Sequence, residues 1–307
     1  MKRPFLIVAF LLATVSMAWS QEEGYAGYSP LFVPKLLSEL PEEVRETSGL
    51  FFFQGRLWTH NDSGGKPVLY AIDTASYQVV QHVTLENAKN KDWEDVCTDG
   101  ERVYIGDFGN NKGKRKNLRI YTFPLSALPD TGDATITVDS IRFSFGDQTV
   151  FEHKKQEHDY DCESVFATED HLYLFSKGWA TGTTRLYRLP KTPGTYVAEV
   201  VNGFDSQGLI TGADYDPQSG TLVLVGYVKD VWLPFLYLIY DFDDAGVKLS
   251  HRRFEMPQLT GAQTEGICFF DEGRCFLSAE TSPTVTSRVF LLDFRKQIAK
   301  DLERAGK

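Results

Sequence analysis

The chain repeats a pattern of short strands, and this repeat constrains its fold more than any other feature of the sequence. Five segments align, and each reads as a strand, a short polar turn and a second strand. The segments start at Glu46, Asp92, Asp161, Thr211 and Gln263, so successive starts lie 46, 69, 50 and 52 residues apart. A third strand with a shared aromatic and aliphatic pattern is expected after each segment, over 68–73, 118–123, 185–190, 237–242 and 288–294.

A fourth, more polar strand follows in four of the five units, over 77–85, 140–145, 196–201 and 247–254. The fifth unit lacks one, and the N-terminal segment over 31–40 is a spare strand that can fill this gap. Four antiparallel strands per unit, repeated around a ring, predict an all-β fold: a five-bladed β-propeller closed by an N-terminal strand. A six-bladed ring is the alternative. We expect a single propeller domain over 21–307 that ends in a short helix over 295–307.

The first 20 residues have the order of a secretory signal peptide. Lys2 and Arg3 precede an apolar run over 5–15, and the small residues Ala18 and Ser20 follow. Without these residues the chain has 30 basic and 42 acidic side chains and a formal charge of −12. This charge argues against nucleic-acid binding and is compatible with cation binding. We expect a secreted or periplasmic monomer with no lipid anchor and no transmembrane helix.

Four cysteines are too few and too scattered for a disulfide scaffold or a zinc site. Cys97 and Cys162 are expected to fill core space. Cys268 and Cys275 flank a tight turn, so they either form a cross-strand disulfide in one hairpin register or remain two reduced thiols.

The first strand of each propeller blade lines the central channel, so residues near its start converge at one mouth. When the units are aligned on the first core residue (Leu50, Val96, Val165, Tyr215 and Ile267), the residues two positions earlier are Ser48, Glu94, Glu163, Ala213 and Glu265. Confined carboxylates raise one another's pKa and are tolerated mainly when a cation neutralises them. Oxygen ligands suit a hard cation, and Ca²⁺ accepts irregular geometry.

We therefore predict a calcium site formed by Ser48, Glu94, Glu163 and Glu265. The alternative is that each glutamate caps strand amides or pairs with a basic neighbour. Asp161, two residues before Glu163, is interpreted as an ordinary strand-start residue at the rim.

The second strand of each unit ends at the same mouth, because it runs antiparallel to the first. These ends continue into loops rich in Gly, Asn and Asp, which make a plausible site for a small-molecule or glycan ligand. The candidate catalytic residues in these loops are Asp62, Asp107, Lys177 and Lys229. The basic loop over 109–117 is interpreted as a mobile, solvated loop rather than a binding patch.

The inner hairpins resemble those of the soluble calcium-activated nucleotidases, or apyrases, which are five-bladed propellers with an axial calcium. The similarity lies in ETSGLFFFQGRLWTHND, RVYIGDFG and TEGICFF, and it covers the five inner hairpins but hardly the outer strands. It implies a serine ligand at Ser48 and glutamates at the other three predicted calcium positions. The chain differs at Ala213, where the family has a serine, and in the loop after Asn61, which lacks one acid and an arginine.

Two functions of different classes follow from these patterns. In the first, the chain is a calcium-dependent hydrolase of phosphoric anhydrides or esters, with Asp62 or Asp107 as general base and Lys177 and Lys229 stabilising negative charge. In the second, it is a non-catalytic propeller that calcium stabilises and that binds a glycan, peptide or protein partner. A lactone or phytate hydrolase is a third possibility, by fold analogy alone.

Overall fold

The computed structural model describes residues 30–242, 250–283 and 285–304. The predicted signal peptide over 1–20 and part of the predicted strand over 247–254 lie outside these residues. Strands dominate the described chain, and α1 (Arg295–Arg304) forms most of the predicted C-terminal helix. Among the described residues, no helix is both long enough and apolar enough to cross a membrane.

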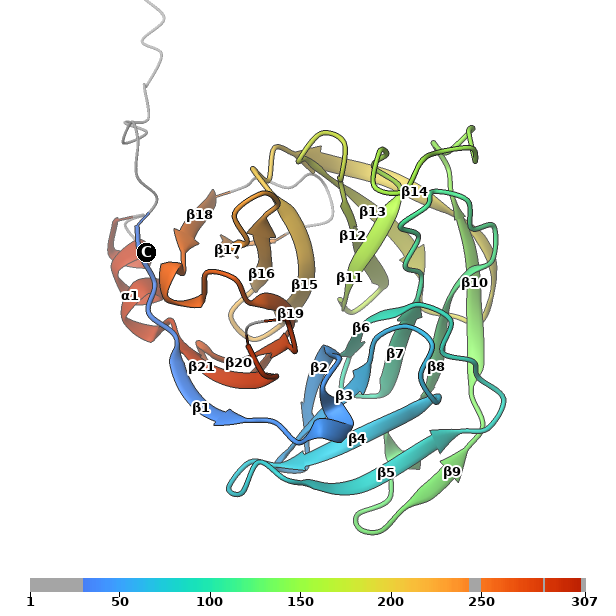
Figure 1. Cartoon of the computed structure of the whole chain (residues 1–307), viewed down its shortest axis with the longest axis horizontal. Coiled ribbons are helices and arrows are strands. Elements are labelled where there is room, and N and C mark those ends of the chain that lie inside the picture. Colours follow the sequence, from blue (N-terminus) through green and yellow to red (C-terminus); the bar gives the residue numbers. More distant parts are fainter. Residues whose placement is uncertain (1–29, 243–249, 284, 305–307) are drawn as a thin grey trace, which may run out of the picture.

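Five strands surround the centre of the molecule, and each contacts the next (Figure 1). These inner strands are β2 (Thr47–Phe53), β6 (Trp93–Thr98), β11 (Asp161–Ala167), β15 (Leu209–Asp216) and β19 (Gln263–Asp271). Contact between β19 and β2 closes the ring. The predicted all-β propeller architecture is therefore confirmed.

Three further sets of strands extend outward from the inner ring. The second strands are β3 (Arg56–Asn61), β7 (Arg102–Asp107), β12 (His171–Lys177), β16 (Thr221–Val228) and β20 (Arg274–Glu280). The third strands are β4 (Val68–Asp73), β8 (Leu118–Pro124), β13 (Thr184–Pro190), β17 (Leu233–Tyr240) and β21 (Arg288–Asp293). The outer strands are β5 (Val79–Leu85), β10 (Asp139–Phe145), β14 (Gly194–Phe204), β18 (Ser250–Glu255) and β1 (Lys35–Glu39).

The N-terminal strand β1 completes the last sheet. It pairs antiparallel with β21, from Lys35 opposite Leu291 to Glu39 opposite Arg288, as the sequence predicts. Two other sheets gain contacts between outer strands. The outer strands β10 and β14 pair in parallel, which joins eight strands into one sheet, and the short strand β9 (Ala134–Ile136) adds to β5.

Burial explains why the strands differ in composition. The inner strand β11 is buried at all seven of its positions, because it has the channel on one side and neighbouring sheets on its faces. In the outer strands β5 and β10, buried residues alternate with partly or fully exposed ones, so these strands have a more polar, period-two sequence. Between the sheets lie layers of aromatic and aliphatic side chains, such as Trp58, Trp93 and Tyr121 between the first two units.

The four cysteines are free and buried. Cys268 lies opposite Phe276, and Cys275 lies opposite Phe269, so the two thiols point to opposite faces of their sheet. They belong to separate core clusters. The alternative of a cross-strand disulfide is therefore wrong, and the reduced-thiol alternative is correct.

Candidate functional site

Each inner strand contains a β-bulge close to its start. In every pairing of an inner strand with its second strand, the register shifts there by one extra residue. The residues at these bulges are Ser48, Glu94, Glu163, Thr211 and Glu265. A bulge re-aims a side chain and increases local twist. The sequence therefore places its axial residues where the backbone departs from a regular ladder.

Thr211, and not Ala213, occupies the axial position of the fourth unit. Ala213 is a fully buried core residue that pairs with Leu224 beyond the bulge. The alignment was wrong here because the small Ala213 gave no strong apolar signal, whereas the partly exposed Tyr215 did. Thr211 supplies a hydroxyl, which donates to the carbonyl of Thr264 at 2.6 Å.

Glycine follows three of the axial residues, as Gly49, Gly212 and Gly266, and two of these positions illustrate how closely the inner strands approach. A Cβ atom on Gly49 would lie 2.2 Å from the nitrogen of Val96, and one on Gly266 would lie 2.1 Å from the carbonyl oxygen of Ser48. Such contacts are far below van der Waals distance. These two positions therefore require glycine for the ring to close.

The four predicted calcium ligands line one cavity of about 170 Å³ at this mouth. Three further charged residues in its wall lie at the ends of second strands and not on inner strands: Asp62 follows β3, Lys177 ends β12, and Glu280 ends β20. The remaining lining residues are polar or aromatic: Asn111, Gln156, Trp179, Tyr227, Trp232 and Gln263. The structure thus brings together Ser48, Glu94, Glu163, Glu265, Asp62 and Lys177.

The closest carboxylate group consists of Asp62, Asp92 and Glu94, which each offer an oxygen within 4.8 Å of the others. Asn90 donates to the carbonyls of Asn61 and Asp62 at 2.9 and 2.8 Å and thereby fixes the first loop against the start of β6. Burial raises the pKa of Asp62 and of Asp92 to about 6, and it also raises the pKa of Glu94 well above its usual value. Three crowded carboxyl oxygens of this kind suit a hard divalent cation.

Lys177 is buried at the channel axis and pairs with one of the predicted ligands. Its Nζ atom lies 3.0 Å from Oε2 of Glu163. Burial opposes the charge on Lys177, but the Glu163 carboxylate prevails and raises the pKa of the ammonium. The ammonium also lies 4.9 Å from the ring centre of Trp179 and 5.3 Å from that of Tyr227, both at cation–π distance. Lys177 is therefore charged within the cavity.

Gln263 connects the two remaining glutamates. Its amide donates to Oε1 of Glu280 and, at 3.4 Å, to Oε1 of Glu265. Burial raises the pKa of Glu265 to about 7, and burial together with the charge of Glu265 raises the pKa of Glu280 to about 9. The cavity thus holds carboxyl groups whose pKa values differ, which is a condition for general acid and base chemistry.

Two predicted catalytic residues lie outside the cavity. Asp107 is buried and accepts from Arg115 Nη2 at 2.8 Å and from the amide of Asp92 at 3.2 Å, so it organises the adjoining loop. Lys229 is exposed, and its ammonium donates to the carbonyl of Trp179 at 3.2 Å. The structure therefore removes Asp107 and Lys229 from the set of residues that surround the axis.

Asp161 is not an ordinary rim residue. It is fully buried, and its two oxygens accept from the amide of Asn110 at 2.5 Å and from the indole of Trp179 at 2.7 Å. Asp161 therefore links the loop after β7 to the loop after β12. This link positions two parts of the cavity wall, Asn111 and Trp179.

Asp92 and Gln263 belong to the site but were not predicted from the sequence. A signal for them exists, because each stands two residues before an axial glutamate, as Asp161 stands two residues before Glu163. Residues two apart share a face of a strand. The repeat alignment therefore contains a second set of polar residues, Asp92, Asp161 and Gln263, at one shared position.

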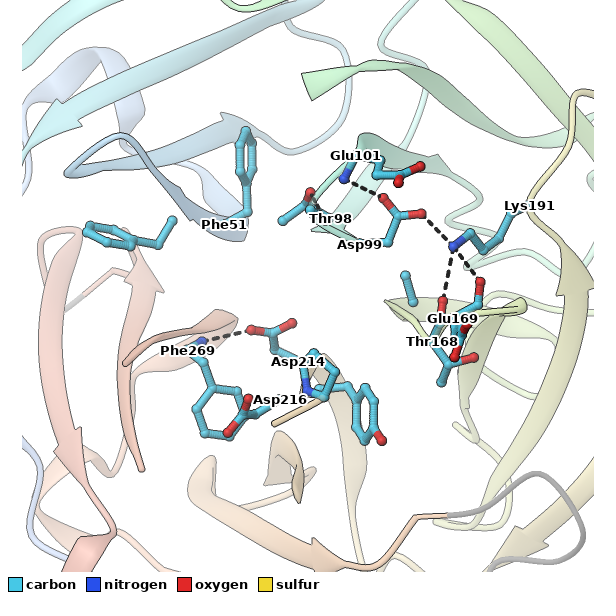
Figure 2. A pocket seen from close by; sticks show the side chains of 15 residues that line it. Phe51, Thr98, Asp99, Glu101, Thr168, Glu169, Lys191, Asp214, Asp216 and Phe269 are labelled. Atoms are coloured by element: carbon cyan, nitrogen blue, oxygen red, sulfur yellow. Dashed lines mark hydrogen bonds and ion pairs between the residues drawn. The ribbon is translucent and has the colours of Figure 1, made fainter. Parts of the chain in front are cut away.

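A larger cavity of about 500 Å³ lies at the opposite ends of the inner strands (Figure 2). Its acids come mainly from turns, and Asp99 is already neutralised by Lys191 at 2.6 Å. Asp214 faces this cavity and accepts from the amide of Phe269 at 2.7 Å, so it cannot serve the axial carboxylates at the other mouth. The smaller cavity holds more buried carboxyl groups in less space, and we regard it as the candidate site.

No protein-family model matches the sequence, and no curated protein matches it. Among solved structures, the fold is similar to that of an exo-β-1,3-galactanase from Phanerochaete chrysosporium, with a TM-score of 0.51 and 12% identity over 81% of this chain and 61% of that one. The chain therefore spans less than two thirds of that protein. An aldose sugar dehydrogenase from Streptomyces coelicolor gives a TM-score of 0.49 and 10% identity over 87% of this chain and 99% of that one. At such identities the galactanase likeness concerns the fold alone.

Proposed function

We propose that the axial cavity is the active site of an exported, calcium-dependent hydrolase of phosphoric esters or anhydrides. The observation that carries this proposal is the gathering of Asp62, Glu94, Glu163, Glu265 and Glu280 around one charged lysine in about 170 Å³. A cavity with this charge would repel phosphate unless a cation neutralised it. The proposal of export rests on the signal-like segment over 1–20.

We further propose that the ring has five blades. The eight-stranded sheet begins and ends with an inner strand, β11 at one end and β6 at the other. It therefore corresponds to two blades joined by their outer strands. The resemblance to calcium-activated nucleotidases is consistent with this count, and it makes nucleoside diphosphates the first substrates to test.

The donor set favours a calcium site formed by Asp62, Asp92 and Glu94 rather than by the four axial residues. The hydroxyl of Ser48 donates to the carbonyl of Glu94, and the carboxylate of Glu163 forms an ion pair with Lys177. Calcium bound by the three carboxylates would supply positive charge that polarises a phosphoryl oxygen.

The remaining residues have distinct roles in the proposed reaction. Lys177 donates to a non-bridging phosphoryl oxygen, and Glu163 keeps its ammonium charged and oriented. Glu265, with a pKa of about 7, accepts the proton of the attacking water near neutral pH. Glu265 thus replaces Asp62 and Asp107, the bases expected from the sequence.

Turnover of p-nitrophenyl phosphate, pyrophosphate and adenosine diphosphate, with calcium and with chelator, tests this function. We expect calcium-dependent release of phosphate and a loss of about 100-fold in kcat for Glu265→Gln. The matched control is Glu272→Gln, which makes the same change at an exposed turn residue. If none of these compounds is hydrolysed in calcium by folded protein, the phosphohydrolase proposal is wrong.

Calorimetric titration of chelator-stripped protein tests the cation separately. Asp92→Asn removes one carboxylate of the proposed site and should weaken calcium binding at least tenfold, whereas Glu272→Gln should not. Equal calcium affinity in both variants would exclude Asp92 as a ligand.

The second candidate function is glycan binding by a non-catalytic, calcium-stabilised propeller. The observation in its favour is the aromatic side of the cavity, where Tyr227 and Trp232 stack with ring centres 5.3 Å apart and Trp179 lies nearby. Aromatic rings of this kind bind the apolar faces of sugars. Oligosaccharide binding without turnover of any phosphate compound would favour this second function.

A further inference from the structure

The basic loop over 109–117 is built differently from the mobile, solvated loop that its composition predicts. Its main chain is fixed by several hydrogen bonds. Gly113 accepts from Gln148 Nε2 at 2.9 Å, Asn111 accepts from the amide of Gln156 at 2.9 Å, and Asn110 Oδ1 accepts from the amide of Arg115 at 2.9 Å. The backbone of this loop is therefore a scaffold that holds its side chains in place.

Beside this scaffold lies a pocket of about 520 Å³, and more than half of the residues that line it are basic. Its basic lining residues are Lys91, Lys112, Lys114, Arg115, Lys116 and Lys155. Arg115 pairs with two acids, Asp107 at 2.8 Å and Asp92 at 3.8 Å. Among the residues that the structure describes, the five lysines form no ion pair with an acidic side chain.

Unneutralised positive charge in one pocket is unusual for this chain, whose formal charge is −10. Lys91 donates only to the amide oxygen of Asn117 at 3.4 Å, and Lys116 lies over the ring of Phe151, so neither partner carries a negative charge. Five ammonium groups around one concave surface therefore repel one another, and a bound polyanion relieves this repulsion. The pocket wall consists of Lys, Arg, Asn and Asp residues only. Among the described residues, none that lines the pocket is aromatic, and the nearby ring of Phe151 is contacted by Lys116, whose Nζ atom lies 4.6 Å from its centre. A base or a sugar therefore finds no open stacking surface in the wall.

The basic pocket adjoins the axial cavity. Asn111 lines both, and Asp92, which lines the basic pocket, belongs to the carboxylate group with Asp62 and Glu94. From this arrangement we infer that the basic pocket binds an oligophosphate chain, which enters it from the axial cavity. The end of the chain at the axis would be the reacting end, and this placement rests on the proposed function.

Binding of inorganic tripolyphosphate to calcium-free protein tests the inference, with affinity measured by calorimetry over a series of salt concentrations. The test variant is Lys112→Gln/Lys114→Gln/Lys116→Gln, and the control is Lys35→Gln/Lys296→Gln/Lys300→Gln, which removes three exposed lysines elsewhere. We expect the test variant to lose at least tenfold in affinity and the control to stay within twofold. The salt slope should fall by about one for each pocket lysine removed.

Three results would overturn the inference. Wild-type protein that does not bind tripolyphosphate, or equal weakening in both triple variants, would remove the basic pocket as its site. A sulfated glycan that binds more tightly than tripolyphosphate with the same lysine dependence would assign the pocket to another class of polyanion. Failure of the proposed function is distinguishable, because lysine-dependent binding would then persist while no phosphate compound is hydrolysed.

Discussion

At the scale of single residues, the axial cavity is governed by carboxyl groups that keep their protons to unusually high pH. Glu280 is the clearest case, because burial and the neighbouring Glu265 raise its pKa from 4.5 to about 9. An unfolded chain releases this proton near pH 4.5, whereas the folded chain keeps it. The contribution of Glu280 to the free energy of unfolding is therefore fully present below pH 4.5, and it is lost as the pH rises toward 9.

We predict that Glu280→Gln flattens the pH dependence of stability in calcium-free protein. In wild type, each such carboxyl lowers the free energy of unfolding by about 1.4 kcal/mol for each pH unit within its window. The variant lacks this slope, so it should become more stable than wild type between pH 6 and 8. Urea unfolding at pH 5, 6, 7 and 8 in chelator measures the effect, and Glu272→Gln is the control. Parallel curves for Glu280→Gln and wild type would contradict the assignment.

The residue identities in the cavity were largely readable from sequence. Glu94, Glu163 and Glu265 stand at one position of the repeat, and a shared position in a rotational repeat implies a shared place near the axis. Lys177 was found, but its burial and its pairing with Glu163 were not. The burial of Lys177 and its ion pair with Glu163 depend on how far β12 extends over the channel, and the spacing of residues along the sequence does not determine this.

At the scale of elements, buried acids join neighbouring inner strands. Asp95, which follows the axial Glu94, accepts from the amide of Val96 at 2.8 Å and from that of Val165 on the next inner strand at 2.9 Å. β11 is an end strand of its sheet and has no strand partner on the channel side, so the carboxyl group of Asp95 satisfies the amide of Val165 there. Inner strands are therefore linked by side chains as well as by packing.

We predict that Asp95→Ala destabilises the protein by about 2–5 kcal/mol, because two buried N–H groups lose their acceptor. Asp95→Asn should cost less, since its amide oxygen can still accept one of the two bonds. Asp170→Ala, at an exposed turn residue, is the control. The free energy of unfolding in urea checks this order. Equal stability of Asp95→Ala and Asp170→Ala would refute the proposed link.

The strands could be predicted from the sequence, whereas the β-bulges within them could not. The predicted third strand over 68–73 matches β4, and the predicted fourth strand over 140–145 lies within β10. The five bulges were not predicted, because a bulge shifts the register of a strand without changing its composition. For the same reason Ala213, and not Thr211, was predicted at the axial position of the fourth unit. The three-residue strand β9 was also missed, since so short a segment carries no periodic signal.

At the scale of the whole molecule, the N-terminal strand closes the ring onto the last sheet. Leu37 of β1 packs on the cluster that contains Val44 and Val289, whereas Leu36 is 49% exposed. Glu39 accepts from Arg288 and Thr286 at 3.1 and 2.9 Å. Residues from the two ends of the described chain thus complete one sheet, in which β1 pairs with the otherwise open edge of β21.

We predict that Leu37→Asp lowers stability by about 2–4 kcal/mol, because it buries a charge and removes an apolar contact. The matched control is Leu36→Asp, the same substitution one residue away on the exposed face, which should cost less than about 1 kcal/mol. Thermal and urea unfolding measure both variants. If the two variants are equally stable, β1 does not close the ring as the structure indicates.

The sequence by itself determined the propeller, the closing strand and the axial glutamates, because a repeated strand pattern and a shared repeat position are one-dimensional properties. Only the tertiary structure decided which groups neutralise one another. It paired Lys177 with Glu163, grouped Asp62 with Asp92 and Glu94, and paired Asp107 with Arg115. It gave the lysines of the basic pocket no acidic partner among the described residues. The physical reason is that charge pairing and pKa depend on distance and burial across different strands, which the order of residues along one chain does not fix.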